Sequence, residues 1–109
     1  MTSETARIRQ LNDWFRSTFI GGRVTITEGV RAQGQPFESE TIERVQTFSA
    51  FTRDNDPYDE HDFGSFEIDG TKVFWKIDYY DRSLTAGSEN PADPSQTTRV
   101  MTIMLAEEY

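Results

Sequence analysis

The sequence contains no cysteine, a single histidine (His61) and no long hydrophobic run. Without cysteine the chain has no disulfide, thiolate zinc site, iron–sulfur cluster or cysteine nucleophile. A lone histidine excludes a site with several histidine ligands. No segment approaches the roughly 18 consecutive apolar residues that a membrane span requires, and the polar residues 1–10 do not resemble a secretion signal. We therefore expect a cytoplasmic protein that does not bind membranes.

The net charge of −8 is concentrated in the second half of the chain. Residues 1–53 contain seven Arg and six Asp or Glu, a net charge of +1, whereas residues 54–109 contain four Lys or Arg and thirteen Asp or Glu, a net charge of −9. An acidic surface repels phosphate backbones and attracts basic protein surfaces. We expect no direct nucleic-acid binding. A basic protein partner is one interpretation of the charge, and solubility alone is the other.

Eight Phe, four Tyr and two Trp supply enough bulky apolar material for one core, and 109 residues are too few for two. The chain therefore predicts a single domain over residues 1–109. Apolar residues at helical spacing predict a helix from Ser3 to Phe19, and alternating β-branched residues predict a strand over 23–27. The segment 38–51 fits either a helix or a strand, and we favour the helix.

The remaining segments complete an α+β domain. Residues 82–97 are rich in Ser, Gly, Asn, Asp and Pro without periodicity, which predicts a long polar loop. Residues 99–106 are apolar on both faces, as in a central strand that is covered on both sides. We expect the N-terminal helix and a second helix to pack on a small, mainly antiparallel sheet of about four strands.

Asp69 and Gly70 lie between two segments of high β-propensity, which predicts a tight hairpin because both turn positions need positive φ. In that register, paired residue numbers add to 139. Val73 and Trp75 then face the core together with Phe66 and Ile77. Continued to its end, the register places His61 opposite Asp78.

Phe74 and Tyr80 point to the other face of this hairpin. They form an apolar strip that either lies under a helix or binds a partner. In the second case the partner is another protein or a second copy of the chain in a homodimer.

Residues 54–62 concentrate five carboxylates around His61. Clustered oxygens suit hard cations, but the alternating ligands, central glycine and distal glutamate of a calcium loop are missing. We therefore expect no metal and no other cofactor. The carboxylates are instead candidates for binding a protein: Asp54, Asp56, Asp59, Glu60 and Asp62.

His61 and Asp78 are also the candidate catalytic pair. A carboxylate beside an imidazole fixes its tautomer, as acid–base catalysis often requires. No activated nucleophile accompanies them, so a structural ion pair is the other interpretation. Whether the protein is an enzyme stays open, and a role without catalysis is favoured.

Several strings of the sequence resemble an uncharacterised bacterial family, the domain of unknown function 3768. These strings are Leu11-Asn12-Asp13, Phe15-Arg16, 22–30, 55–57, 60–64, 75–81 and 98–109. The resemblance supplies no reaction, cofactor or catalytic residue. It implies an accessory role in mobile genetic elements. Together with the acidic charge, this suggests a protein that inhibits host defence, as an anti-CRISPR or anti-restriction factor.

Overall fold

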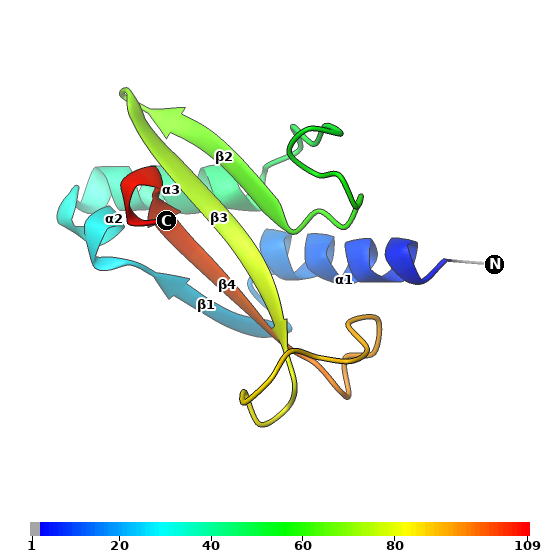
Figure 1. Ribbon diagram of the computed structural model, residues 1–109. Helices are drawn as coiled ribbons and strands as arrows, with labels where there is room; N and C mark the ends of the chain where they lie inside the picture. Colours follow the sequence, from blue (N-terminus) through cyan, green and yellow to red (C-terminus); the bar gives the residue numbers. More distant parts are fainter. Residues whose placement is uncertain (1–2) are drawn as a thin grey trace.

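The computed structural model describes residues 3–109 and contains helices packed on a four-stranded mixed sheet (Figure 1). The expected α+β class is confirmed. The elements in chain order are α1 (Glu4–Thr18), β1 (Gly22–Ile26), α2 (Glu28–Ala32), α3 (Gln35–Gln46), β2 (Phe63–Ile68), β3 (Thr71–Tyr80), β4 (Thr98–Leu105) and the 3-10 turn η1 (Ala106–Glu108).

The N-terminal helix α1 lies where its apolar spacing predicted it. The Ser3 hydroxyl accepts a hydrogen bond from the Ala6 amide at 3.0 Å and so caps the first turn. The helix ends at Thr18. The amide of the C-cap residue Phe19 still donates to the Phe15 carbonyl at 2.7 Å, and the left-handed backbone of Phe19 (φ 61°) then turns the chain out of the helix. Ile8 and Phe15 are buried on the face toward the sheet.

The segment between α1 and the hairpin is more helical than the sequence predicted. Strand β1 confirms the expected strand with a shift of one residue. The short helix α2 follows it and was not predicted, because five residues are too few for a periodic pattern. Helix α3 resolves the ambiguous segment 38–51 in favour of a helix, which ends at Gln46.

The hairpin of β2 and β3 has the predicted turn and register. Asp69 (φ 50°) and Gly70 (φ 81°) both adopt positive φ, and Phe63 pairs with Lys76 at the far end of β2. Val73 and Trp75 are fully buried. The turn type fixes the register, and the register sends alternate side chains of each strand into the core.

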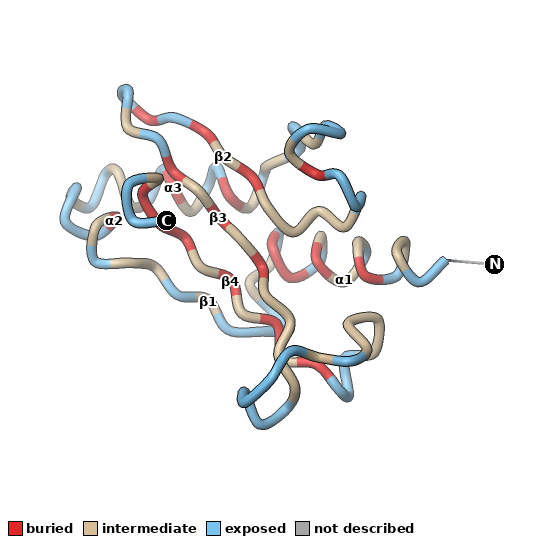
Figure 2. Tube along the Cα trace, in the orientation of Figure 1, coloured by how far each residue is buried: buried red, intermediate tan, exposed pale blue. Residues whose placement is uncertain are grey.

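The sheet has the order β1-β4-β3-β2, with β1 parallel to β4 and the other neighbours antiparallel. In Figure 1, α1 and α3 lie behind the sheet, and the buried residues in Figure 2 follow the strands and the helices that face them. Strand β4 is central, as predicted, but its front face is only partly covered. Among the described residues, no helix is long and apolar enough to span a membrane.

The segment 82–97 is a loop, as predicted, and contacts β3 through a bridge between Tyr80 and Gly87. After β4, η1 turns the chain back toward α2. The Glu108 carboxylate there accepts hydrogen bonds from the Thr27 hydroxyl at 2.7 Å and the Leu105 amide at 2.8 Å. A bond from the Gly29 amide at 3.2 Å completes this contact with the start of α2.

Candidate functional site

His61 lies among the carboxylates of Asp13, Asp56 and Asp59. Its Nδ1 is 2.8 Å from Asp13 Oδ1, and its Nε2 is 3.7 Å from Asp56 Oδ2 and 3.9 Å from Asp59 Oδ1. The predicted pair of His61 with Asp78 is therefore wrong. The hairpin register ends at Phe63, and His61 (φ 56°) turns away from the strand direction toward α1.

Asp78 has a different partner on the front of the sheet. Its carboxylate accepts a hydrogen bond from Lys76 Nζ at 2.8 Å, and this bond raises the pKa of Lys76. Because Asp78 pairs with Lys76 and His61 pairs with Asp13, the geometry on which the acid–base hypothesis rested is not formed.

Asp56 holds the 50–62 loop together from inside. Its Oδ1 accepts hydrogen bonds from the amides of Glu60 and His61, both at 3.1 Å. Its side chain is only 2% exposed. Its Oδ2 has no hydrogen-bond partner among the described residues, although it is buried. A buried carboxylate oxygen without a partner is unfavourable, so this atom needs an explanation.

Two arginines of α1 border the cluster. Arg9 Nη1 donates to the Asp59 carbonyl at 2.9 Å and to Asp59 Oδ2 at 2.7 Å, while Arg16 Nη1 donates to Asp13 Oδ1 at 2.9 Å. Each arginine holds one carboxylate that faces His61. No local pattern in the sequence indicates these contacts, because α1 is far from residue 61 in the chain.

Phe51 forms the aromatic wall of the site. Its ring stacks on the His61 imidazole at 3.7 Å between centroids and with an angle of 2° between planes. The guanidinium of Arg16 lies 5.2 Å from the centre of the Phe51 ring, as in a cation–π contact. The stack fixes the plane of the imidazole. An open hollow at the surface is lined by Phe51, Asp56, Asp59 and His61 and by neighbours on the same loop.

A buried polar network lies on the other side of Glu60. Asn12 Nδ2 donates to the Glu60 carbonyl at 3.0 Å and to Tyr79 Oη at 2.8 Å, and the Tyr79 hydroxyl donates to Glu60 Oε1 at 2.8 Å. Arg99 Nε donates to Asn12 Oδ1 at 2.7 Å. Burial raises the pKa of Tyr79 and lowers that of Arg99. A signal for this network was present in the sequence, since Asn12 interrupts the apolar stripe of the first helix.

The five carboxylates predicted to bind a protein have different environments. Asp54 is exposed, and Asp59 is exposed but paired with Arg9. Asp56 is buried, and Glu60 accepts the hydroxyl of Tyr79. Burial, followed by repulsion from Glu60, raises the pKa of Asp62. The loop therefore does not present a uniform row of free carboxylates.

Phe74 and Tyr80 lie on the front face of the sheet, which α1 and α3 do not cover (Figure 1). The sequence left two positions open for this strip, under a helix or at a partner-binding surface. In the described residues, neither α1 nor α3 covers it. The Phe74 ring contacts Phe63 at 5.3 Å and Tyr109 at 5.6 Å between centroids. Tyr80 borders a shallow hollow with Leu84 and Val100.

Together, the geometry defines a small α+β domain with a carboxylate–histidine cluster between its first helix and an acidic loop. The chain belongs to the family described as protein of unknown function (DUF3768), whose model matches residues 26–108. The match confirms the family resemblance. The matching strings before residue 26, including Asp13, lie outside it. No curated protein and no solved structure matches the chain.

Proposed function

We propose that the protein is a binding domain without catalytic activity, which docks on a basic protein surface through the loop 52–60. The observation that carries this proposal is the exposure of Tyr58, whose residue surface is 76% accessible at the tip of a well-anchored loop. Tyrosine is enriched among the residues that dominate binding energy at protein interfaces, because it supplies a large contact area with few rotatable bonds.

The loop around Tyr58 is held in one conformation by its own hydrogen bonds. The Asp56 amide donates to the Thr52 carbonyl at 2.8 Å, and Asn55 Nδ2 donates to the Ala50 carbonyl at 2.9 Å. The Asp59 amide donates to the Asp56 carbonyl at 3.1 Å. A loop that is ordered before it binds loses less conformational entropy on association. These bonds therefore support a docking role for Tyr58.

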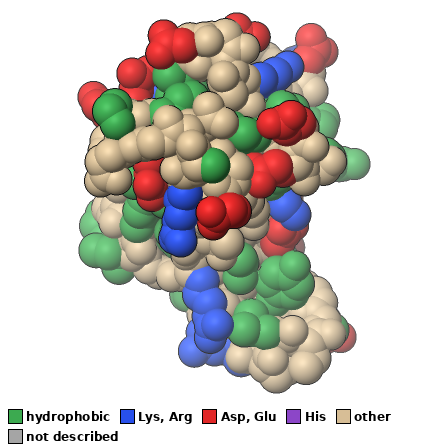
Figure 3. Space-filling model, turned by 90° about the vertical axis from the view of Figure 1, so that its left-hand side faces the viewer, with side chains coloured by type: hydrophobic (Ala, Val, Ile, Leu, Met, Phe, Trp, Pro, Cys, Tyr) green, Lys and Arg blue, Asp and Glu red, His purple; other side chains and the backbone are tan. Residues whose placement is uncertain are grey.

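The charge of the loop favours a basic partner. Asp54, Asp59 and Glu60 bring negative charge close to Tyr58, and Arg53 and the Asp59 partner Arg9 oppose part of it. By contrast, Figure 3 shows the left-hand side of the view in Figure 1, where Asp and Glu are mixed with Lys, Arg and hydrophobic side chains. Charge complementarity at the edge of an interface raises association rates and selects partners more than it adds affinity.

A narrower form of the proposal concerns the kind of partner. A protein with a cationic channel for nucleic acid, such as a restriction or CRISPR complex, presents the kind of basic surface that an acidic loop would bind. An accessory protein of mobile elements would gain from blocking such a channel. Adding the protein to such a complex should then release its bound DNA, and an unchanged DNA complex would contradict this narrower form.

A photo-crosslinking amino acid placed at residue 58 tests the docking surface. We expect covalent capture of a protein partner from position 58 and not from position 109, since Tyr109 is equally exposed but far from the loop in the chain and in contact with Phe74 instead. With the isolated partner, Tyr58→Ala should weaken binding by about tenfold or more, whereas Tyr109→Ala should leave it unchanged.

Asp54→Asn addresses the electrostatic part of the same complex. It should slow association at low salt and have little effect at high salt, because exposed charges are screened over about 8 Å at physiological ionic strength. Equal capture from both positions, or an affinity unaffected by Tyr58→Ala, would refute docking through this loop.

A further inference from the structure

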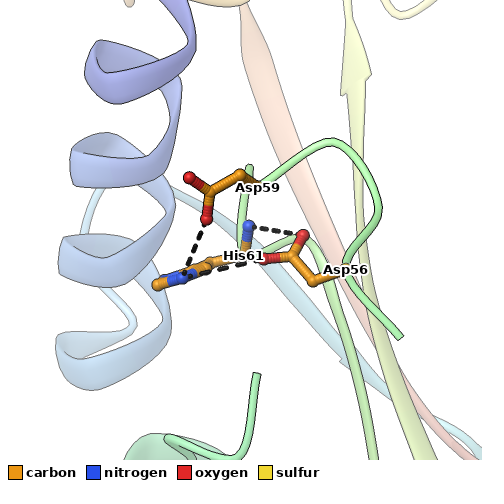
Figure 4. A group of neighbouring side chains, drawn as sticks. All are labelled: Asp56, Asp59 and His61. Carbon is orange, nitrogen blue, oxygen red and sulfur yellow. Dashed lines mark hydrogen bonds and ion pairs between the residues drawn. The ribbon is translucent and has the colours of Figure 1, made fainter. Parts of the chain in front are cut away.

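We propose that Asp56, Asp59 and His61 form a binding site for Zn²⁺, a function separate from the proposed docking of a protein and not dependent on it. Figure 4 shows the three side chains converging from one loop. Each contributes one ligand atom, and these atoms lie within 4.8 Å of one another. The three donors are Asp56 Oδ2, Asp59 Oδ1 and His61 Nε2.

The buried oxygen of Asp56 is the observation that points to a cation. Its side chain is 2% exposed, and Oδ2 has no hydrogen bond among residues 3–109. It faces His61 Nε2 at 3.7 Å, which is too long for a hydrogen bond. A carboxylate oxygen loses its hydration on burial and needs a compensating partner. A metal ion placed between Oδ2 and Nε2 supplies that partner.

Hydrogen bonds outside the cluster leave the three donor atoms free for the metal. Asp59 uses Oδ2 to bind Arg9, so its Oδ1 faces inward. Asp56 uses Oδ1 for the amides of the loop, so its Oδ2 faces inward. The direction of these carboxylates is thus fixed before any ion binds.

His61 is oriented in the manner of a metal ligand. Its Nδ1 lies 2.8 Å from Asp13 Oδ1. When Nδ1–H donates to Asp13, Nε2 carries the lone pair that points toward Asp56 and Asp59. Metal-binding histidines in proteins regularly have such a carboxylate behind the ring, which fixes the tautomer and makes the ligand more basic. The stacked ring of Phe51 prevents the imidazole from rotating out of this position.

The donor set and the spacing favour zinc over calcium or magnesium. Calcium and magnesium prefer six or more oxygen ligands, whereas zinc accepts a mixture of imidazole nitrogen and carboxylate oxygen. Bonds of about 2.1 Å in a tetrahedral site separate neighbouring ligands by about 3.4 Å. The observed 3.7 Å and 3.9 Å from His61 Nε2 exceed this by about 0.3 and 0.5 Å, and all three ligand atoms lie within 4.8 Å of one another.

The charges around the site also suit a divalent ion. Asp13, Asp56 and Asp59 face the imidazole, and Arg9 and Arg16 each neutralise one of them from the side of α1. With a neutral imidazole, the cluster retains a negative charge on the buried Asp56. The three side chains line an open surface hollow together with Thr52, Arg53 and Pro57, so water can reach an ion bound there.

The spacing of the ligand residues in the sequence did not predict this site. The expectation of no metal rested on the spacing of a calcium loop, which residues 54–62 do not have. Left-handed backbone at Asp59 (φ 58°) and His61 (φ 56°) brings together ligands that an extended chain would point apart.

A zinc titration followed by NMR tests the proposal on the full chain, prepared without a polyhistidine tag. Because the sequence contains one histidine, the ring signals of His61 report the site without overlap. We expect equimolar Zn²⁺ to shift these signals to saturation, and a tenfold excess of Mg²⁺ to leave them unchanged. Ring signals that do not respond to Zn²⁺, or that respond equally to Mg²⁺, would overturn the site.

Variants then identify the ligands by calorimetry with ZnCl₂. His61→Gln, Asp56→Asn and Asp59→Asn should each weaken zinc binding by at least about tenfold, and Asp13→Asn by about 10–100-fold through the orientation of the ring. Asn at position 56 keeps the oxygen that caps the loop, so this variant retains the fold. Asp54→Asn is the matched control and should bind zinc as the unmodified chain does.

Cobalt absorption provides a second measurement, since four-coordinate Co²⁺ gives intense visible bands. Their presence in the unmodified chain and their loss in His61→Gln support the site. Zinc affinity that is unchanged in His61→Gln would show binding elsewhere and refute it. Tyr58→Ala should bind zinc normally, so that failure of the docking proposal and failure of the zinc proposal are distinguishable.

Discussion

At the scale of single residues, Asn12 connects parts of the chain that are distant in sequence. Its side chain is fully buried and bonds to Glu60 in the acidic loop, to Tyr79 on β3 and to Arg99 on β4. Arg99 is itself anchored to the Pro91 carbonyl at 2.6 Å. The Asn12 side chain thus forms hydrogen bonds with polar groups of one loop and two strands, and it supplies the acceptor for Nε of the buried Arg99 guanidinium.

Asn12→Ala should lower the free energy of unfolding by about 2–4 kcal/mol, because it leaves Arg99 Nε without its acceptor and the Tyr79 hydroxyl oxygen and Glu60 carbonyl without their donor. Urea unfolding followed by circular dichroism measures this. Gln10→Ala, at an exposed position of the same helix, is the control and should change stability by less than about 0.5 kcal/mol. A loss below 1 kcal/mol in Asn12→Ala would mean that water replaces the amide in this network.

His61 was identifiable from the sequence as the centre of a site, because it is the sole histidine and lies among carboxylates. Its partner was not. The register of the hairpin was correct as far as Phe63, but a strand register does not extend into residues whose backbone leaves the strand. Asp13 is an ordinary polar residue of a helix, and only the packing of α1 against the loop brings it to the imidazole.

At the scale of elements, the turn η1 fastens the start of α2 to the end of β4. Gly29 is necessary for this contact, since a Cβ there would lie 2.5 Å from the Glu108 carboxyl. The hydrogen bonds of Thr27 and of the Leu105 and Gly29 amides lower the pKa of Glu108. The contact between η1 and the start of α2 is therefore weakened by acid.

Glu108→Gln tests this contact through pH. Because the folded-state pKa is lowered, the stabilisation is present above the unfolded pKa of about 4.3 and is lost as pH falls through the folded value. At pH 7 the variant should unfold at a lower urea concentration than the unmodified chain, and the gap should close below the folded pKa. Glu107→Gln is the control. A gap of equal size at pH 7 and pH 2.5 would contradict the role of the charge.

At the scale of the whole molecule, the sequence predicted the fold class, the long helices and the strands. It did not predict which strands pair or which face of the sheet the helices cover. Local signals, such as the Asp69-Gly70 turn and the stripe of α1, identify elements because they depend on neighbouring residues. The parallel pairing of β1 with β4 and the open front of the sheet depend on residues far apart in the chain. No short pattern encodes such contacts.

The sheet order predicts which parts of the molecule open last. Strands β3 and β4 each have neighbours on both sides, whereas β1 and β2 are edges. Native-state hydrogen exchange should therefore be slowest at buried central positions such as Trp75 and Ile103, and faster in the edge strands and in α2. Exchange in α1 that is slower than in β4 would place the most stable unit in the helix instead.

The pairing of β1 with β4 also sets an order of events during synthesis. Strand β1 leaves the ribosome early, but its neighbour in the sheet begins at Thr98. At about 5–20 residues per second, β1 waits roughly 4 to 14 seconds for its partner. The hairpin of β2 and β3 is complete once Tyr80 has been translated, and its edge toward β4 then also stays unpaired until β4 follows. The nascent chain therefore needs protection from association with other chains until β4 emerges and closes the sheet between two strands made before it.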